Sequence, residues 1–167
     1  ADSFDAIICK MGLMLLSNPV KALRGMHRAV KPTGKVVCLV WSSEDKNLCR
    51  GVPLAIFRRF GADFSLAPGL RLLFALGSPG ILEETFRAAG FLDVAVHTVP
   101  TRWRFLSTAE VIRHTKNSSP GLERITAQLS ESARDLAWAE IEQQFSQFEG
   151  PNGFEAPGEV LIGVGTK

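Results

Sequence analysis

The chain has 167 residues, of which 46% are hydrophobic and 22% are charged. This composition is typical of one globular domain that is long enough to bury a sizeable core. The formal net charge is +2, from 19 basic and 17 acidic residues, and gives no electrostatic footprint for nucleic acid. We therefore expect a single domain over residues 1–167 and no nucleic-acid partner.

The three cysteines, Cys9, Cys38 and Cys49, lack the spacing of a metal site or a redox motif. Two of them lie inside apolar runs, where a reduced thiol acts as a small hydrophobe. The longest apolar stretches, Met11–Leu16 and Leu70–Leu76, are too short to span a bilayer, and no leader peptide opens the chain. The sequence predicts a soluble cytoplasmic protein with no metal and no membrane partner.

The first 41 residues predict a strand, a helix and a second strand. Phe4–Cys9 is short and almost continuously apolar, which is typical of a strand buried on both faces of a parallel sheet. Asn18 is a good N-cap, with Pro19 at the first helical position, and the helix should end before Pro32. Val36–Trp41 then predicts a second doubly buried strand.

Residues 43–77 predict a helical insertion or lid, with helices at Leu48–Phe60 and Leu66–Leu76. The second helix, together with Phe57, Phe60 and Phe64, could close over an apolar substrate and exclude water from a reacting centre. An ordinary core beneath an insertion explains the same residues equally well.

The second half of the chain predicts more helices and two strands. A helix opens at Ser78-Pro79 and ends at Gly90, where glycine suits left-handed geometry. The strand that follows should be broken at Pro100 and occupy a sheet edge. The other predicted elements are helices over residues 107–114, 119–129 and 133–148 and a final strand at Val160–Gly165.

Aromatic and basic residues alternate in the second part of that edge strand, where Trp103 and Phe105 are interleaved with Arg102 and Arg104. Such a pattern can stack nucleic-acid bases. An edge strand with one buried face produces the same alternation, and we favour packing.

Several sequence segments resemble the second half of a class I S-adenosylmethionine-dependent methyltransferase. Ser3–Ile8 is similar to the family's fourth strand, and Ala22–Gly34 to the helix and turn that lead into the fifth. Ser78–Phe91 resembles the last helix and the start of the sixth strand, and Val160–Gly165 is placed like the antiparallel seventh. The resemblance implies an α/β fold, a partial doubly wound Rossmann-like sheet of about four strands with a helical insertion.

The resemblance also implies where ligands would bind. Cys9, Lys10 and Met11 would pass the methionyl end of S-adenosylmethionine, and Trp41 and Ser42 would line the substrate side. Many relatives carry arginine where Lys10 stands, so a bidentate contact becomes a point charge. No catalytic residue is assigned, because methyl transfer depends mainly on positioning.

The cofactor-binding half of the family's pattern is missing from this chain. In the family, the glycine-rich loop and the ribose-binding acidic residue lie upstream of the segments that this chain resembles. Gly163–Gly165, the only Gly-x-Gly here, is inside the final strand with no helix behind it to receive a ligand. We expect a truncated domain that is inactive alone.

Three functions remain open from the sequence. The first is a truncated methyltransferase that acts on a small-molecule acceptor. The second is a non-catalytic interaction module, whose exposed first strand pairs with a complementing chain or a second copy. The third is a fragment of a nicotinamide-dependent oxidoreductase, whose fingerprint glycines are missing as well. It ranks lowest because Ser78–Phe91 resembles the methyltransferases better.

Overall fold

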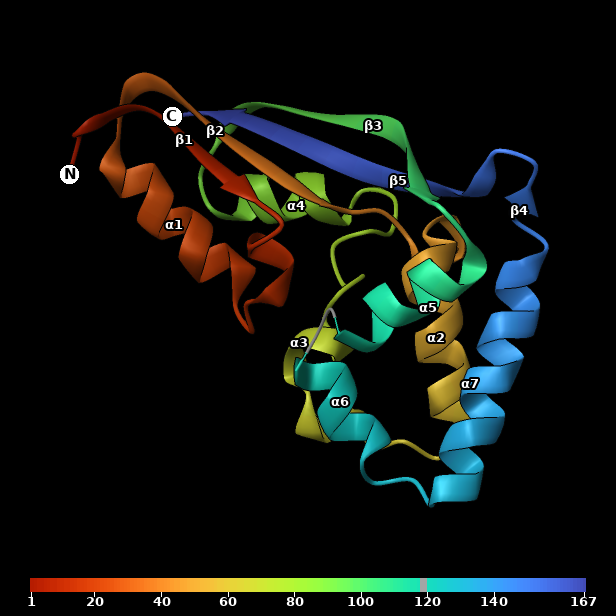
Figure 1. Cartoon of the computed structure of the whole chain (residues 1–167). Helices are drawn as coiled ribbons and strands as arrows, with labels where there is room; N and C mark the ends of the chain where they lie inside the picture. The colour runs from red at the N-terminus through yellow and green to blue at the C-terminus, as the bar shows by residue number, and fades with distance from the viewer. Residues whose placement is uncertain (118–119) are drawn as a thin grey trace. The chain divides into compact units, whose positions relative to one another are not determined.

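The computed structural model describes residues 1–117 and 120–167, which form two compact units (Figure 1). Unit 1 comprises Ala1–Ser43, Leu72–Pro100 and Glu159–Lys167, and unit 2 comprises Glu44–Arg71 and Thr101–Gly158. The segment predicted as an insertion is thus divided between the units, since Glu44–Arg71 belongs to unit 2 and the residues from Leu72 onward belong to unit 1.

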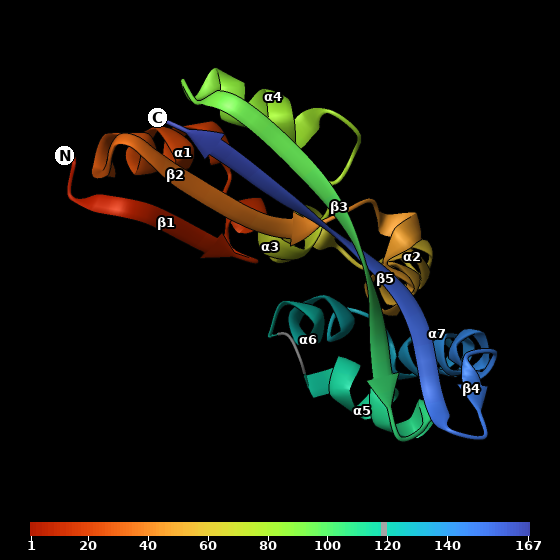
Figure 2. The same ribbon diagram turned by 90° about the horizontal axis from the view of Figure 1, so that it is seen from above.

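An open mixed sheet has the strand order β1-β2-β5-β3. β1 and β2 are parallel, and β5 is antiparallel to β2, as the arrows in Figure 2 show. The predicted partial sheet with an antiparallel final strand is therefore confirmed. The strands are β1 (Phe4–Lys10), β2 (Val30–Trp41), β3 (Leu92–Phe105), the two-residue β4 (Glu149–Gly150), which pairs with β5, and β5 (Gly153–Thr166).

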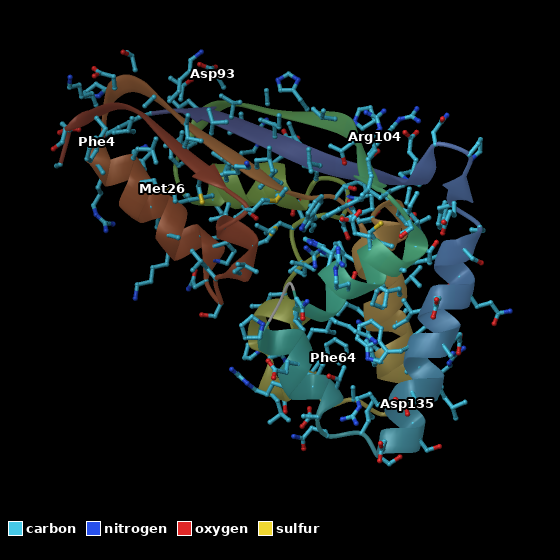
Figure 3. All side chains as sticks on the ribbon, in the orientation of Figure 1. Phe4, Met26, Phe64, Asp93, Arg104 and Asp135 are labelled. Atoms are coloured by element: carbon cyan, nitrogen blue, oxygen red, sulfur yellow. The ribbon has the colours of Figure 1, made fainter. Side chains whose placement is uncertain are left out.

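In unit 1, α1 (Pro19–Ala29) and α4 (Ile81–Ala88) lie on the same face of the sheet (Figure 1). The side-chain oxygen of Asn18 accepts a hydrogen bond from the Lys21 backbone N–H at 2.8 Å, which confirms the predicted cap. Leu23 is fully buried beneath the sheet, and Met26 lies one turn further along α1 (Figure 3). The first strand, helix and second strand therefore form as the sequence predicts.

Two glycines of β5 allow α4 to pack closely on the sheet. A Cβ atom on Gly163 would lie 2.8 Å from Cε2 of Phe86, and one on Gly165 would lie 2.8 Å from Cδ1 of the same ring. Phe86 is fully buried. The Gly-x-Gly sequence thus has a packing role, and Gly90 ends α4 with a φ of 98°, as expected for a left-handed C′ position.

The opposite face of the sheet is open, because no helix of unit 1 covers it within the described residues. The strand register aligns Ile8, Val37 and Val164 in one row across this face. Ile8 is 77% exposed and Phe4 is 55% exposed. The prediction that Phe4–Cys9 is buried on both faces is wrong for this chain, since β1 is an edge strand and its outer face has no cover.

The other edge of the sheet is β3, as predicted, but the predicted break at Pro100 is wrong. The strand runs without interruption from Leu92 to Phe105. An edge strand tolerates proline because the missing N–H can fall on the side that has no neighbour.

Unit 2 is mostly helical. Its helices are α2 (Leu48–Arg59), α3 (Pro68–Arg71), α5 (Thr108–Asn117), α6 (Pro120–Thr126) and α7 (Glu131–Ser146). The predicted helix over Leu66–Leu76 is wrong, since only α3 forms there. Leu73 and Leu76 are buried in unit 1 instead, so burial rather than helical periodicity explains their apolar character. The predicted N-cap at Ser119 lies outside the described residues.

The alternation on β3 separates two kinds of contact in unit 2. Arg102 and Arg104 form ion pairs with Glu155, and Arg104 projects toward solvent (Figure 3). On the other face of the strand, the rings of Trp103 and Phe105 are stacked with their centroids 6.3 Å apart. This arrangement agrees with the packing interpretation of the sequence.

Candidate functional site

The carboxyl ends of β1 and β2 lie next to each other in unit 1. The backbone N–H of Met11, directly after β1, donates a hydrogen bond to the Leu39 carbonyl of β2 at 2.8 Å. In open α/β sheets, ligands bind outside the carboxyl ends of the strands. The structure therefore brings the two predicted segments, Cys9–Met11 and Trp41–Ser42, to the same end of the sheet.

The chain turns sharply where β1 ends. Met11 has a φ of 55°, a left-handed conformation that is uncommon outside glycine and that is enriched at functional sites. Gly12 follows, and a Cβ there would lie 3.2 Å from Sγ of Cys9. A short 3-10 helix, η1 (Leu13–Leu15), then directs the chain under the sheet.

One residue that sequence reasoning missed connects the two strand ends. Met14 is 3% exposed, and its Sδ accepts a hydrogen bond from the backbone N–H of Trp41 at 3.4 Å. The only available signal was the apolar stretch Met11–Leu16, which indicated burial but no partner. Met14 thereby holds the end of β2 close to the turn after β1.

The predicted site residues divide between the two faces of the sheet. Lys10 is aligned with Leu39, and Trp41 with Val160, on the open face. Cys9 instead is aligned with Cys38 on the face that α1 and α4 cover. Lys10 and Trp41 are therefore the predicted residues that a ligand on the open face can reach.

The thiol of Cys38 is fully buried. Burial raises its pKa to about 12, and the neighbouring Cys9 adds to this shift through its charge and a hydrogen bond. A thiol with so high a pKa is a poor nucleophile at neutral pH. Cys38 is therefore a protonated thiol at neutral pH and a poor nucleophile toward molecules that approach from solution.

Ser42 lies inside unit 1. It is 2% exposed, and its backbone N–H donates to the Glu159 carbonyl at 3.2 Å. A Cβ on Gly77 would come within 2.3 Å of the Ser42 carbonyl oxygen, so the two backbones are in close contact. That Ser42 binds substrate stays a prediction, and its burial favours a positioning role.

Unit 2 contains a cavity of about 590 Å³ along α2. Its walls are mainly apolar, with charged side chains among them, and this volume falls in the range of small-molecule pockets. Lining residues include Leu48, Val52, Ala55, Ile56, Glu44 and Arg58.

The part of the chain that the structure describes contains no group of three or more His, Cys, Asp or Glu side chains that could hold a metal ion. Within the same residues, every helix is too short or too polar to cross a lipid bilayer.

The strand order, the antiparallel final strand and the position of α1 and α4 define part of a class I methyltransferase fold. Residues 1–38 match the family described as a methyltransferase domain. The first 38 residues are therefore similar in sequence to that family, and the chain as a whole has part of a methyltransferase-like fold. No curated protein sequence matches it.

Solved structures share this fold at low sequence identity. A putative methyltransferase from Bacillus halodurans has a TM-score of 0.55 and 11% identity, and the match covers 99% of this chain and 65% of that one. A cyclopropane-fatty-acyl-phospholipid synthase-like protein from Lactobacillus casei has a TM-score of 0.50 and 15% identity, with coverages of 99% and 57%. A phosphoethanolamine N-methyltransferase from Haemonchus contortus has a TM-score of 0.47 and 16% identity, with coverages of 99% and 34%. The chain spans less than two thirds of the length of each.

Proposed function

We propose that this chain is the carboxyl-terminal part of an S-adenosylmethionine-dependent methyltransferase that acts on a small molecule. The observation that carries the proposal is the joining of two strand ends at one edge of the sheet. The Met11–Leu39 and Trp41–Met14 hydrogen bonds hold the proposed cofactor segment beside the proposed acceptor segment. In this fold, that edge is where ligands bind.

The residues at this edge fit one end of the cofactor. The turn at Met11 leaves Lys10 exposed at the carboxyl end of β1, on the open face. Its ammonium group would pair with the methionyl carboxylate. When bound, S-adenosylmethionine supplies a methyl group activated by a sulfonium. The adenosine end would need other groups than the single Gly-x-Gly sequence of this chain. Both of those glycines pack against Phe86, so they are not available to a ligand.

This chain would contribute positioning rather than covalent chemistry. Trp41 is half-buried on the open face and offers an apolar surface for the acceptor. Ser42 and Met14, both buried, would fix the backbone on either side of the reacting groups. Correct orientation of two reactants can supply a large part of the rate enhancement.

The open surfaces of unit 1 support the proposal that this chain holds only part of the site. The outer edge of β1 and the row of Ile8, Val37 and Val164 would be covered by the rest of the domain or by a complementing chain. The same observation favours a second candidate, an interaction module that pairs through β1 and does no chemistry.

Binding of S-adenosylhomocysteine to the protein as encoded, with whatever precedes this chain, tests the Lys10 role. Lys10→Met removes the proposed charge, and Lys21→Met removes an exposed lysine from α1 as a matched control. We expect Lys10→Met to weaken binding roughly tenfold, the usual loss for a hydrogen bond to a charged group. Lys21→Met should bind like the parent, and equal affinity for Lys10→Met would contradict the assignment.

Calorimetric titration of the 167-residue chain with S-adenosylmethionine tests whether its site is complete. We expect no measurable heat of binding. Micromolar binding would contradict the proposal that essential cofactor contacts lie elsewhere. If the encoded protein also fails to bind S-adenosylhomocysteine, the interaction module replaces the methyltransferase as the better candidate.

A further inference from the structure

Two of the three cysteines are direct neighbours across β1 and β2. The register aligns the Cα atoms of Cys9 and Cys38, so both side chains lie on the same face of the sheet, where Cys38 is fully buried. Adjacent strands are about 4.8 Å apart, which falls within the roughly 4.4–6.8 Å range of Cα separations found in disulfides. The backbone therefore already places the pair at a distance that a disulfide can bridge.

The two thiols also contact each other. A side-chain hydrogen bond links them, and both cysteines are free thiols. Cys38 is fully buried, whereas Cys9 is only half-buried. A small oxidant from solvent thus reaches the Cys9 thiol first, and the Cys38 sulfur lies next to it.

We propose that Cys9 and Cys38 form an oxidation site that hydrogen peroxide converts to a disulfide. Peroxide first transfers one oxygen to the Cys9 sulfur, giving a sulfenic acid and one water as the O–O bond breaks. The Cys38 sulfur then attacks the Cys9 sulfur, and the S–S bond forms as the S–O bond breaks. The proton of Cys38 leaves with the departing hydroxide as a second water, so two thiols and one peroxide give one disulfide and two waters.

The position of β1 makes this closure feasible. A disulfide needs its Cβ atoms closer together than a parallel pair usually holds them, so one strand must shift slightly. β1 is an edge strand whose outer side has no partner among the described residues, so it can approach β2 without displacing a neighbour. The new bond would fasten the strand that ends in Lys10 and Met11. This oxidation does not depend on the proposed methyltransferase function.

Peptide mapping of the folded 167-residue chain after mild peroxide treatment tests the proposal. Trypsin separates the three cysteines into Ala1–Lys10, Val36–Lys46 and Asn47–Arg50. We expect the first two peptides to appear as one disulfide-linked species, two hydrogen atoms lighter than their sum. The Asn47–Arg50 peptide should keep its free thiol, because Cys49 is 3% exposed and has no cysteine partner in register.

Matched variants and an unfolded control make the result decisive. Cys49→Ala should form the linked peptide as the parent does, whereas Cys38→Ala should leave Cys9 as a sulfenic or sulfinic acid. The chain oxidised in denaturant should give all three cysteine pairings, which shows that the native selectivity comes from the fold. Oxidation of folded protein to Cys9 sulfinic acid without the linked peptide, or equal amounts of the three pairings, would overturn the proposal.

Discussion

The backbone N–H of Trp41 donates a hydrogen bond to Sδ of Met14 at 3.4 Å. Trp41 is the last residue of β2, and Met14 lies in the short helix that follows β1. A thioether is a weak acceptor, yet it is the group that receives this N–H inside unit 1. The contact thus ties the two ends of the proposed site together through a side chain that would otherwise look like ordinary core.

Replacing Met14 with leucine keeps the buried volume and removes the sulfur acceptor. We expect Met14→Leu to lower the free energy of unfolding by about 1 kcal/mol, since the Trp41 N–H loses its partner. Urea unfolding measures this change. Met26→Leu on α1 is the control, because the Met26 side chain accepts no such bond, and equal losses in the two variants would mean that the Met14 sulfur contributes nothing.

A methyl group at Gly163 should be costly because the adjacent helix leaves no room for it. The new Cβ would lie 2.8 Å from Phe86 and 3.0 Å from Leu82, both fully or almost fully buried. We expect Gly163→Ala to destabilise the chain by roughly 1–3 kcal/mol in urea unfolding. Gly150→Ala, where no atom lies within 4 Å of the added carbon, should be neutral or slightly stabilising. A harmless Gly163→Ala would show that α4 does not pack against β5 as described.

Cys49 should make the protein sensitive to alkali. Burial raises the pKa of its thiol to about 12 from an ordinary value of 9.0, and nearby Arg50 offsets only part of this shift. Between these two pH values the unfolded thiol loses its proton while the folded one keeps it. The contribution to stability is therefore complete below pH 9.0 and falls as the pH rises toward 12.

The variant Cys49→Ala isolates this effect. Over that pH range, the parent should lose up to about 1.4 kcal/mol more per pH unit than the variant. Urea unfolding at several alkaline pH values gives both slopes. Parallel slopes would contradict the assignment of the shift to burial of Cys49.

The open edge of β1 should make the isolated chain self-associate. Ile8 is 77% exposed on an edge strand, which is a template for pairing with other chains. We expect Ile8→Lys to reduce light scattering at high protein concentration without lowering the midpoint of thermal unfolding. Leu106→Lys changes another exposed aliphatic residue, 84% accessible and outside the sheet, and should leave the scattering unchanged. If both variants reduce scattering equally, the association does not depend on β1.

Local rules predicted the elements of unit 1 well. The Asn18 cap, the proline after it and the apolar runs on either side were sufficient for β1, α1 and β2, because each signal acts within a few residues. Gly90 likewise marked the end of α4. These features need no knowledge of distant parts of the chain.

Errors arose where distant contacts decide the structure. Leu73 and Leu76 are buried in unit 1, and a helix was inferred from the apolar character of their segment alone. Pro100 did not break β3, because a strand at a sheet edge does not need a backbone N–H on the side that has no neighbouring strand. The Met14–Trp41 bond could not be predicted, because nothing in sequence pairs a thioether with one particular backbone N–H.

The row formed by Ile8, Val37 and Val164 also bears on how such a chain would fare in a cell. Chaperones and proteases recognise apolar surface of the kind that folded proteins usually conceal. Chaperones and proteases would therefore bind a copy of this chain whose open face is uncovered, even when its sheet is correctly formed. Its lifetime would be set by how soon that face is covered.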